Sequence, residues 1–183
     1  MTADARLLYL VRHCLAAGQT PDAPLTPEGI AQARLLADLL APLGIDRVVS
    51  SPFRRARESI APLATRLSLP VETDDRLIER VLSPAPLRDW QAHLRRTFDD
   101  DDYCLKGGES SRTATARAVA VLDDARRHPA RATVIVTHGN LLALLLRHFD
   151  GRVGFAAWES LTNPDVYRVT IGQQPQPFVR IWR

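Results

Sequence analysis

Two short apolar runs, each followed at once by a histidine, constrain the fold of this 183-residue chain more than any other feature. The first run covers residues 7–11 (LLYLV) and is followed by Arg12 and His13; the second lies within ATVIVTHGN, residues 132–140, and stops at His138. Runs of this length that are rich in β-forming residues are typical of strands buried on both faces. Such strands occur in parallel sheets covered by helices, so an α/β fold is expected.

The segments between these strands have helical and turn patterns. Thr26 followed by Pro27 predicts an N-cap with proline at the first helical position, and the helix is expected to end before Pro42 and Gly44. The tail is expected to form two further strands, DVYRVTI and PFVRIWR, as a hairpin-like edge of the sheet. Other predicted elements are a strand in DRVVSSPF, helices over 53–67, 109–127 and 141–149, and a short strand in LPVETDDRL.

The length and the 45% hydrophobic composition predict one domain, residues 1–183. Its least regular part is the stretch of about residues 80–108, which contains several prolines and glycines and the acidic run 99–102. This stretch is expected to be a helical and loop insertion over the active site. Consecutive acids are typical of a solvated loop, so no metal site is predicted there.

Charge and cysteine content limit the classes of partner. The net charge is +3 and Lys106 is the only lysine, but no basic stripe with interleaved aromatic residues is present, so no nucleic-acid partner is expected. Cys14 and Cys104 have neither metal-like spacing nor a paired framework, which favours a reducing compartment. The apolar stretch near the N-terminus is too short to span a bilayer. A cytoplasmic protein without a membrane partner is therefore expected.

The residues at the two strand ends predict an anion site. In open α/β sheets, ligands bind outside the carboxyl ends of the strands, so Arg12, His13 and His138 are expected to converge there. Gly139 and Asn140 would present backbone N–H groups to the same anion, and phosphate suits this pocket. A single histidine at a strand end is more often an ordinary hydrogen-bonded residue; two matched strand ends favour a functional site.

Five motifs in this order resemble the histidine phosphatase superfamily, also called the phosphoglycerate mutase-like family: LVRH, SSPFRRA, RLIER, GES and VTHGN. The resemblance runs from Leu8 to about Leu146. It implies a three-layer αβα sandwich, with a mostly parallel central sheet, helices on both faces and an antiparallel edge strand. It also implies a reaction that passes through phosphohistidine.

The resemblance assigns roles to particular residues. His13 matches the nucleophile, Arg12 and Arg55 match phosphate ligands, Glu79 matches the proton donor, and His138 matches the second pocket histidine, charged or donating a hydrogen bond. These residue types suit the chemistry, because a neutral imidazole can attack phosphorus while arginines hold the charge of the transferring group. Without the motif order, Glu79 would be interpreted as a solvated carboxylate between two arginines.

Other positions carry weaker assignments. Gly139 and Asn140 line the rim of the phosphate site, and Glu109 and Ser110 are expected to be structural, with Ser110 as a helix N-cap. The family usually has glycine where this chain has Cys14, so the loop after His13 is expected to follow a different path. Gln19 is a candidate to replace a missing amide of that loop. A cysteine nucleophile is less well supported, because the glycine-rich, arginine-ended loop of cysteine phosphatases is missing.

The expected function is hydrolysis of a small phosphomonoester metabolite without a metal or cofactor. The alternatives are phosphoglycerate mutase-type phosphoryl transfer, for which the resemblance implies a longer chain, and a non-catalytic phosphate-binding module. A homodimer that pairs through the tail at a sheet edge is one option for the oligomeric state. Substrate choice is expected to come from the stretch between Glu79 and Glu109. Its candidate residues are Trp90, His93, Arg95, Arg96, Phe98, Tyr103 and Lys106.

Overall fold

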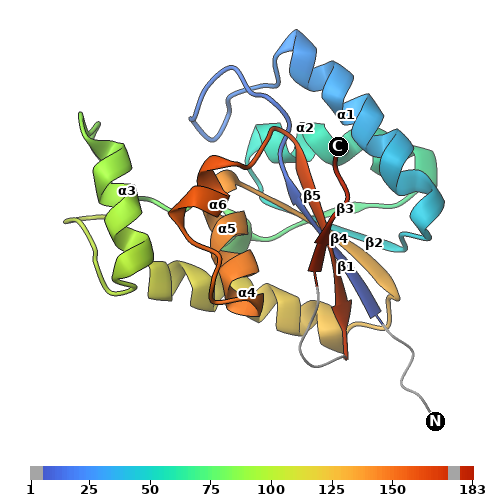
Figure 1. Ribbon diagram of the computed structural model, residues 1–183. Coiled ribbons are helices and arrows are strands. Elements are labelled where there is room, and N and C mark those ends of the chain that lie inside the picture. Colours follow the sequence, from blue (N-terminus) through green and yellow to red (C-terminus); the bar gives the residue numbers. More distant parts are fainter. Residues whose placement is uncertain (1–5, 173–177) are drawn as a thin grey trace.

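A computed structural model describes residues 6–172 and 178–183, which form a six-stranded sheet flanked by helices (Figure 1). The strand order is β3-β2-β4-β1-β5-β6. The first four of these strands run parallel to one another, whereas β5 is antiparallel to β1 and β6 is antiparallel to β5. The strands are β1 (Arg6–Arg12), β2 (Arg47–Ser50), β3 (Val71–Thr73), β4 (Ala132–Thr137), β5 (Asp165–Ile171) and β6 (Phe178–Arg180). The predicted mostly parallel sheet with an antiparallel edge is thus confirmed.

The helices lie on both faces of this sheet (Figure 1). Helices α1 and α2 pack on one face, and α3 to α6 lie on the other. The helices are α1 (Pro27–Leu40), α2 (Arg54–Leu67), α3 (Trp90–Asp99), α4 (Ser111–Arg127), α5 (Gly139–Phe149) and α6 (Phe155–Glu159), with 3₁₀ turns at Ala41–Leu43 and Asp75–Leu77. Helix α6 was not predicted from the sequence.

Strand β1 shows why the fold has three layers. Its side chains alternate between two separate apolar clusters: Leu8 and Leu10 pack with residues of α4 and α5, whereas Tyr9 and Val11 pack with residues of α1 and α2. Each of these four side chains is at most 2% exposed. A strand with apolar residues on both faces needs a helical layer on each side. The two clusters confirm the αβα sandwich.

Helix starts follow the sequence closely. The Oγ1 of Thr26 accepts a hydrogen bond from the Gly29 N–H at 3.0 Å, and Ser110 caps α4 in the same way by accepting from Thr113 at 3.1 Å. Both predicted N-caps are confirmed. The chain leaves the 3₁₀ turn after α1 through Gly44 at φ 69°, a backbone conformation that glycine adopts without strain.

The irregular stretch after Glu79 contains α3 between two loops. Leu94 and Phe98 are buried and join the apolar cluster beneath α4 and α5. Helix α3 also packs against α6, and the two lie at the same side of the molecule in Figure 1.

The extent of the domain over residues 1–183 stays a prediction. Within the described part of the chain, no helix is long and apolar enough to cross a membrane.

Candidate active site

The two histidines meet because β1 and β4 are neighbours in register. Arg12, the last residue of β1, lies opposite Thr137, the last residue of β4. The next residue, His13, donates its backbone N–H to the Thr137 carbonyl at 3.0 Å. The rings of His13 and His138 then lie with centroids 5.1 Å apart at an angle of 64°. The structure thus brings together the residues that follow both apolar runs.

Hydrogen bonds to both ring nitrogens define the state of His13. Its Nδ1 lies 2.7 Å from the carbonyl oxygen of Cys14, which can only accept, so Nδ1 carries the proton. Its Nε2 accepts from the Nε–H of Arg55 at 3.2 Å and therefore has the lone pair. Burial lowers the pKa of His13 to about 4, and the charges of Arg55 and Arg12 act in the same direction against the Cys14 hydrogen bond. The ring is a neutral base with its lone pair on Nε2.

Arg12 lies at the end of the sheet, and its guanidinium is only partly hydrogen-bonded. Its Nη1 donates to the Leu161 carbonyl at 3.0 Å, and its buried Nε has no partner among the described residues. Gly139 packs against the guanidinium so closely that a Cβ there would lie 3.0 Å from three of its atoms. Desolvation lowers the Arg12 pKa, and Glu79 and Asp165 oppose the effect. This packing explains the glycine after His138.

Arg55 comes from the first turn of α2 and is 1% exposed. Its Nη1 donates to the backbone carbonyls of Gln19 and Thr20 at 3.1 and 2.8 Å. Burial lowers its pKa, with Glu79 opposing. Neither Arg55 nor Arg12 forms an ion pair with a carboxylate in the described ranges, so their positive charge is available to a bound anion.

His138 is buried, and Ser51 holds one of its ring nitrogens. The Ser51 Oγ lies 2.8 Å from His138 Nε2 and also accepts the Phe53 N–H at 3.3 Å. Nδ1 of His138 has no partner among the residues described. Burial lowers the pKa of His138 well below its usual value, and the charges of the nearby arginines act in the same direction. The ring is therefore neutral, and of the two expected states the hydrogen-bonding one fits.

Glu79 joins the site by binding the start of α5. Its Oε2 accepts the Asn140 backbone N–H at 3.0 Å, and its Oε1 accepts from Leu141 at 3.1 Å and from Arg80 at 2.9 Å. The expectation that the Asn140 backbone N–H faces a bound anion is therefore wrong, because the Glu79 carboxylate occupies it. A carboxylate has about four lone-pair positions, so three N–H bonds leave room for one proton.

The side chain of Asn140, in contrast, is available. It is 7% exposed, and neither its Oδ1 nor its Nδ2 has a partner within the described residues. Gln19 contributes differently: its backbone carbonyl binds Arg55, while its side chain is exposed at the cavity. A buried amide without a partner is costly, which makes Asn140 a group that a ligand can satisfy.

Cys14 fits its position without strain. Among the described residues other than glycine, positive φ occurs at Ser68 and not at Cys14, so the expected detour of the loop after His13 has no backbone cause. The Cys14 N–H donates to Ser59 Oγ at 2.8 Å, and the side chain is fully buried. Burial raises the pKa of the thiol to about 11, against the effect of its hydrogen bonds. A protonated, enclosed thiol is a poor nucleophile.

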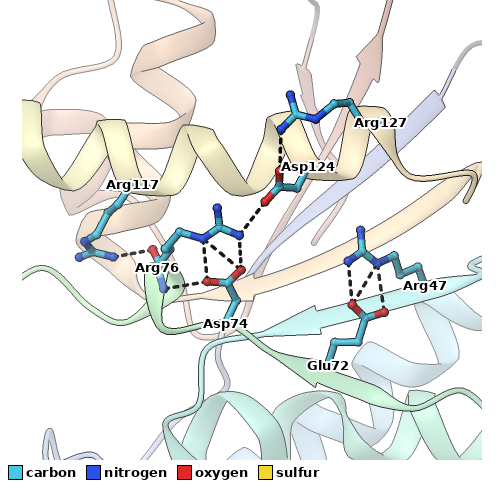
Figure 2. Close-up of polar contacts among 7 residues, drawn as sticks. All are labelled: Arg47, Glu72, Asp74, Arg76, Arg117, Asp124 and Arg127. Carbon is cyan, nitrogen blue, oxygen red and sulfur yellow. Dashed lines mark hydrogen bonds and ion pairs between the residues drawn. The ribbon is translucent and has the colours of Figure 1, made fainter.

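Glu109 reaches the site through Arg117. The two side chains pair at 2.7 Å, and Arg117 Nη1 donates to the carbonyls of Arg76 and Ile78 at 2.6 and 3.0 Å. Figure 2 shows Arg76 in turn between the carboxylates of Asp74 and Asp124, at 2.6 and 2.7 Å. This network attaches the segment before Glu79 to α4, so Glu109 has the expected structural position.

A cavity of about 500 Å³ lies over this end of the sheet. Of the seven residues expected to determine substrate choice, Trp90 lines it; Phe98 is in the core, and His93 is hydrogen-bonded to Tyr103 at 2.7 Å. The lining residues are Arg12, Gln19, Glu79, Arg80, Leu82, Trp90, Leu94, Gly139, Asn140 and Trp158. Sequence reasoning missed Arg80, Leu82, Leu94 and Trp158 as lining residues.

Two positioning residues also escaped the sequence analysis. Ser51 lies within the quoted motif SSPFRRA, so its place beside the site was visible although its contact with His138 was not. Asn163 donates from its Nδ2 to the backbone carbonyl of His13 at 2.8 Å. It lies 150 positions from His13, and nothing in its local sequence indicates this contact.

The chain is similar to known proteins in sequence and in fold. Residues 8–181 match the family described as "Histidine phosphatase superfamily (branch 1)". "Probable phosphoglycerate mutase GpmB" of Yersinia pestis (strain Pestoides F) is 30% identical, over 92% of this chain and 86% of that protein. "Uncharacterized protein Rv0525" of Mycobacterium tuberculosis is 48% identical over 62 residues, so the match spans 34% of this chain and 31% of that relative.

A solved structure is similar over nearly the whole chain. It is titled "The complex structure of mycobacterial glucosyl-3-phosphoglycerate phosphatase Rv2419c with inorganic phosphate". It matches with a TM-score of 0.76 and 26% identity, and the match covers 97% of this chain and 96% of that one.

Proposed function

Because the chain belongs to the histidine phosphatase superfamily, branch 1, we propose that it hydrolyses small phosphate monoesters through a phosphohistidine at His13. One observation carries the proposal: the Nε2 lone pair of a neutral, buried His13 lies beside the guanidinium of Arg55. A nucleophile of this kind needs a fixed tautomer, which the bond from Nδ1–H to Cys14 provides. The similar mycobacterial glucosyl-3-phosphoglycerate phosphatase, solved with inorganic phosphate, supports the same substrate class.

In the first step, Nε2 of His13 attacks phosphorus, an N–P bond forms and the bond from phosphorus to the ester oxygen breaks. The leaving alkoxide takes a proton from Glu79. Arg12, Arg55 and the Nδ1–H of His138 bind the equatorial oxygens, where the charge of the transferring group is spread. In the second step, water attacks phosphorus, Glu79 accepts the proton of that water, and phosphate leaves while His13 regains its lone pair.

Mutase activity is a second candidate, because the Yersinia pestis relative is named a probable phosphoglycerate mutase. In a mutase, the phosphoryl group on His13 returns to a bound hydroxyl group of the substrate instead of passing to water. Incubation with 3-phosphoglycerate separates the two reactions, because a phosphatase releases inorganic phosphate and a mutase forms 2-phosphoglycerate. We expect phosphate release.

The nucleophile is tested with His13→Ala. We expect hydrolysis of p-nitrophenyl phosphate to fall by at least about 1,000-fold, since removal of a nucleophile has effects of this size or larger. Wild-type activity should withstand EDTA and be inhibited by vanadate. Rapid quenching with radiolabelled substrate should trap an acid-labile, alkali-stable adduct at His13. A wild-type protein that binds phosphate but never hydrolyses an ester would instead be a binding module.

The role of Glu79 is tested with Glu79→Gln on two kinds of ester. We expect alkyl phosphates to lose about 100-fold in kcat, and aryl phosphates less than about 10-fold, because general acid catalysis matters most for a basic leaving group. The glutamine amide also meets the N–H groups at the start of α5, so some loss of stability is expected. Because a loss of stability lowers the activity on both kinds of ester equally, the ratio of the two losses in kcat still reports the role of Glu79 as an acid. Equal losses would exclude Glu79 as the acid.

A further inference from the structure

The cavity lined by Arg12 and Glu79 has two chemically different ends. The inner end carries the charged and polar groups Arg12, Glu79, Gly139 and Asn140 described above. The outer end is apolar and is formed by the side chains of Leu82, Trp90, Leu94 and Trp158. Because the two ends belong to one cavity, a phosphate bound at Arg12 would direct the rest of its ester toward the apolar end.

Two of the four side chains at this apolar end are tryptophans from different helices. Trp90 begins α3 and Trp158 lies in α6; their rings meet edge to face, with centroids 5.9 Å apart at 84°. Trp90 remains 43% exposed. Trp158 already packs against Phe155, with ring centroids 5.1 Å apart, so the flat surface open to a third ring is that of the exposed Trp90.

Exposed apolar side chains also gather at the mouth of the cavity. Trp90 and Val81 are two of the five large apolar side chains that are exposed in the described part of the chain. Val81 lines an adjoining hollow of about 600 Å³, which shares Glu79, Arg80 and Trp90 with the cavity. Exposed apolar surface next to a polar site is typical of ligand binding.

Two arginines near this apolar end, Arg80 and Arg95, already have partners within the protein. Arg80 is 5% exposed and donates to the Glu109 carbonyl at 2.8 Å and to the hydroxyls of Thr97 and Ser111 at 2.8 and 3.3 Å. Arg95 of α3 lies over the Phe155 ring, 4.0 Å from its centroid, and does not line the cavity. The apolar end thus favours a neutral group over a second acidic group.

We propose that the apolar end binds the leaving group, and that the preferred substrates are phosphate monoesters of alcohols with a neutral, ring-sized apolar group. The inference rests on the proposed phosphatase activity and names its substrate class. Acidic esters such as 3-phosphoglycerate have no ring for the tryptophans and would bring a carboxylate against the apolar side chains, where Arg80 is already engaged.

Two alkyl phosphates test the proposal. 2-Phenylethyl phosphate and ethyl phosphate have similarly basic leaving groups, so their difference reports binding. We expect kcat/KM to be at least about 10-fold higher for the phenylethyl ester, as for other apolar pocket contacts. Trp90→Ala should reduce the ratio below about 3, and circular dichroism checks independently that the variant is folded.

Matched variants complete this test. Trp158→Ala should act like Trp90→Ala, whereas Trp182→Ala removes a half-buried tryptophan that lines a different hollow, with Leu35 and Leu39, and should preserve the ratio. A wild-type ratio near one overturns the proposal even if no variant folds. A ratio unchanged in both Trp90→Ala and Trp158→Ala, or a higher kcat/KM for 3-phosphoglycerate than for the phenylethyl ester, also overturns it.

Phosphonates separate this inference from the proposed function. 3-Phenylpropylphosphonate and propylphosphonate match the two esters in shape but cannot be hydrolysed, so calorimetry measures their binding without turnover. A dissociation constant about 10-fold lower for the phenyl compound, equalised by Trp90→Ala, supports the apolar subsite even in a protein that hydrolyses nothing. Equal dissociation constants in a wild-type protein that hydrolyses esters reject the subsite and retain the phosphatase.

Discussion

Ser51 determines which ring nitrogen of His138 carries the proton that can be donated to a bound phosphate. A neutral imidazole has one N–H, and its position depends on the partner of the other nitrogen. Since Ser51 Oγ already accepts the Phe53 N–H, its own hydrogen is free to go to His138 Nε2, which leaves the N–H on Nδ1. That is the nitrogen without a partner in the described residues. The Ser51 hydroxyl thus fixes the Nδ1–H of His138 as a donor for a bound phosphate without contacting the phosphate itself.

Ser51→Ala should therefore change the tautomer of His138. We expect the proton to be shared between Nδ1 and Nε2, which ¹⁵N NMR of the ring detects, and kcat to fall by about 10-fold through partial loss of one phosphate donor. Ser50→Ala is the matched control, because Ser50 is equally buried but donates to the Ser51 carbonyl instead of His138. If both variants lose the same activity with an unchanged tautomer, Ser51 has only a packing role.

The candidate catalytic residues could be predicted from the sequence, but the residues that position them could not. His13 and His138 stand out because each follows an apolar run, and the register of β1 and β4 brings them together. Asn163 supports the His13 carbonyl from a loop far along the chain, and the acceptors of Asn140 and Leu141 come from Glu79. Contacts of this kind depend on how loops pack, which local sequence does not encode.

At the scale of elements, α4 holds the segment that carries Glu79. Arg117 links Glu109 to the carbonyls of Arg76 and Ile78, and the Glu109–Arg117 pair is less than one-fifth exposed. Breaking such a pair leaves a half-buried carboxylate and two carbonyls without their donor. The position of Glu79 thus depends on a helix that contributes no side chain to the lining of the cavity.

Arg117→Met should cost about 2 kcal/mol in the free energy of unfolding and reduce kcat for alkyl phosphates more than for aryl phosphates, as expected for a displaced acid. The control is Arg112→Met on the same helix, which breaks an ion pair with Asp102 whose side chains are 65% and 67% exposed. We expect a much smaller loss of stability there, because exposed ion pairs contribute little. Urea unfolding and the alkyl-to-aryl ratio measure both effects, and similar losses in the two variants would contradict the assigned role.

The elements themselves were predicted where patterns are strong. The caps at Thr26 and Ser110 and the apolar strands were all found. Helix α5 begins at Gly139, two residues before the predicted start, because Glu79 supplies acceptors to its first turn from another element. Helix α6 has five residues, Phe155–Glu159, which is too short for a periodic pattern. It was missed for that reason, and with it the contact of Trp158 with the cavity.

At the scale of the whole molecule, the sandwich encloses two neutral histidines at one end of the sheet. Burial lowers the pKa of both His13 and His138. The unfolded chain takes up these protons near the ordinary value of 6.5, whereas folded His13 takes up its proton near 4. Between these values the unfolded state binds more protons than the folded state, so acid favours unfolding. The lone pair needed for catalysis therefore makes the fold sensitive to mild acid.

This sensitivity predicts a particular pH profile. The contribution of His13 is complete above about pH 6.5 and decreases as the pH falls toward 4, with about 2 kcal/mol lost between pH 7.5 and pH 5 and a further loss from His138. Carboxylates whose pKa is lowered, such as Asp74 and Asp124, act at lower pH, so this interval isolates the histidines.

Urea unfolding at the two ends of this interval measures the effect. His13→Gln should reduce the loss by about 2 kcal/mol, because glutamine takes up no proton in either state. His148→Gln on α5 is the control, since His148 is exposed and should leave the profile unchanged. If wild type and His13→Gln lose equal stability between pH 7.5 and pH 5, His13 is not held neutral, and the proposed nucleophile lacks its lone pair in mild acid.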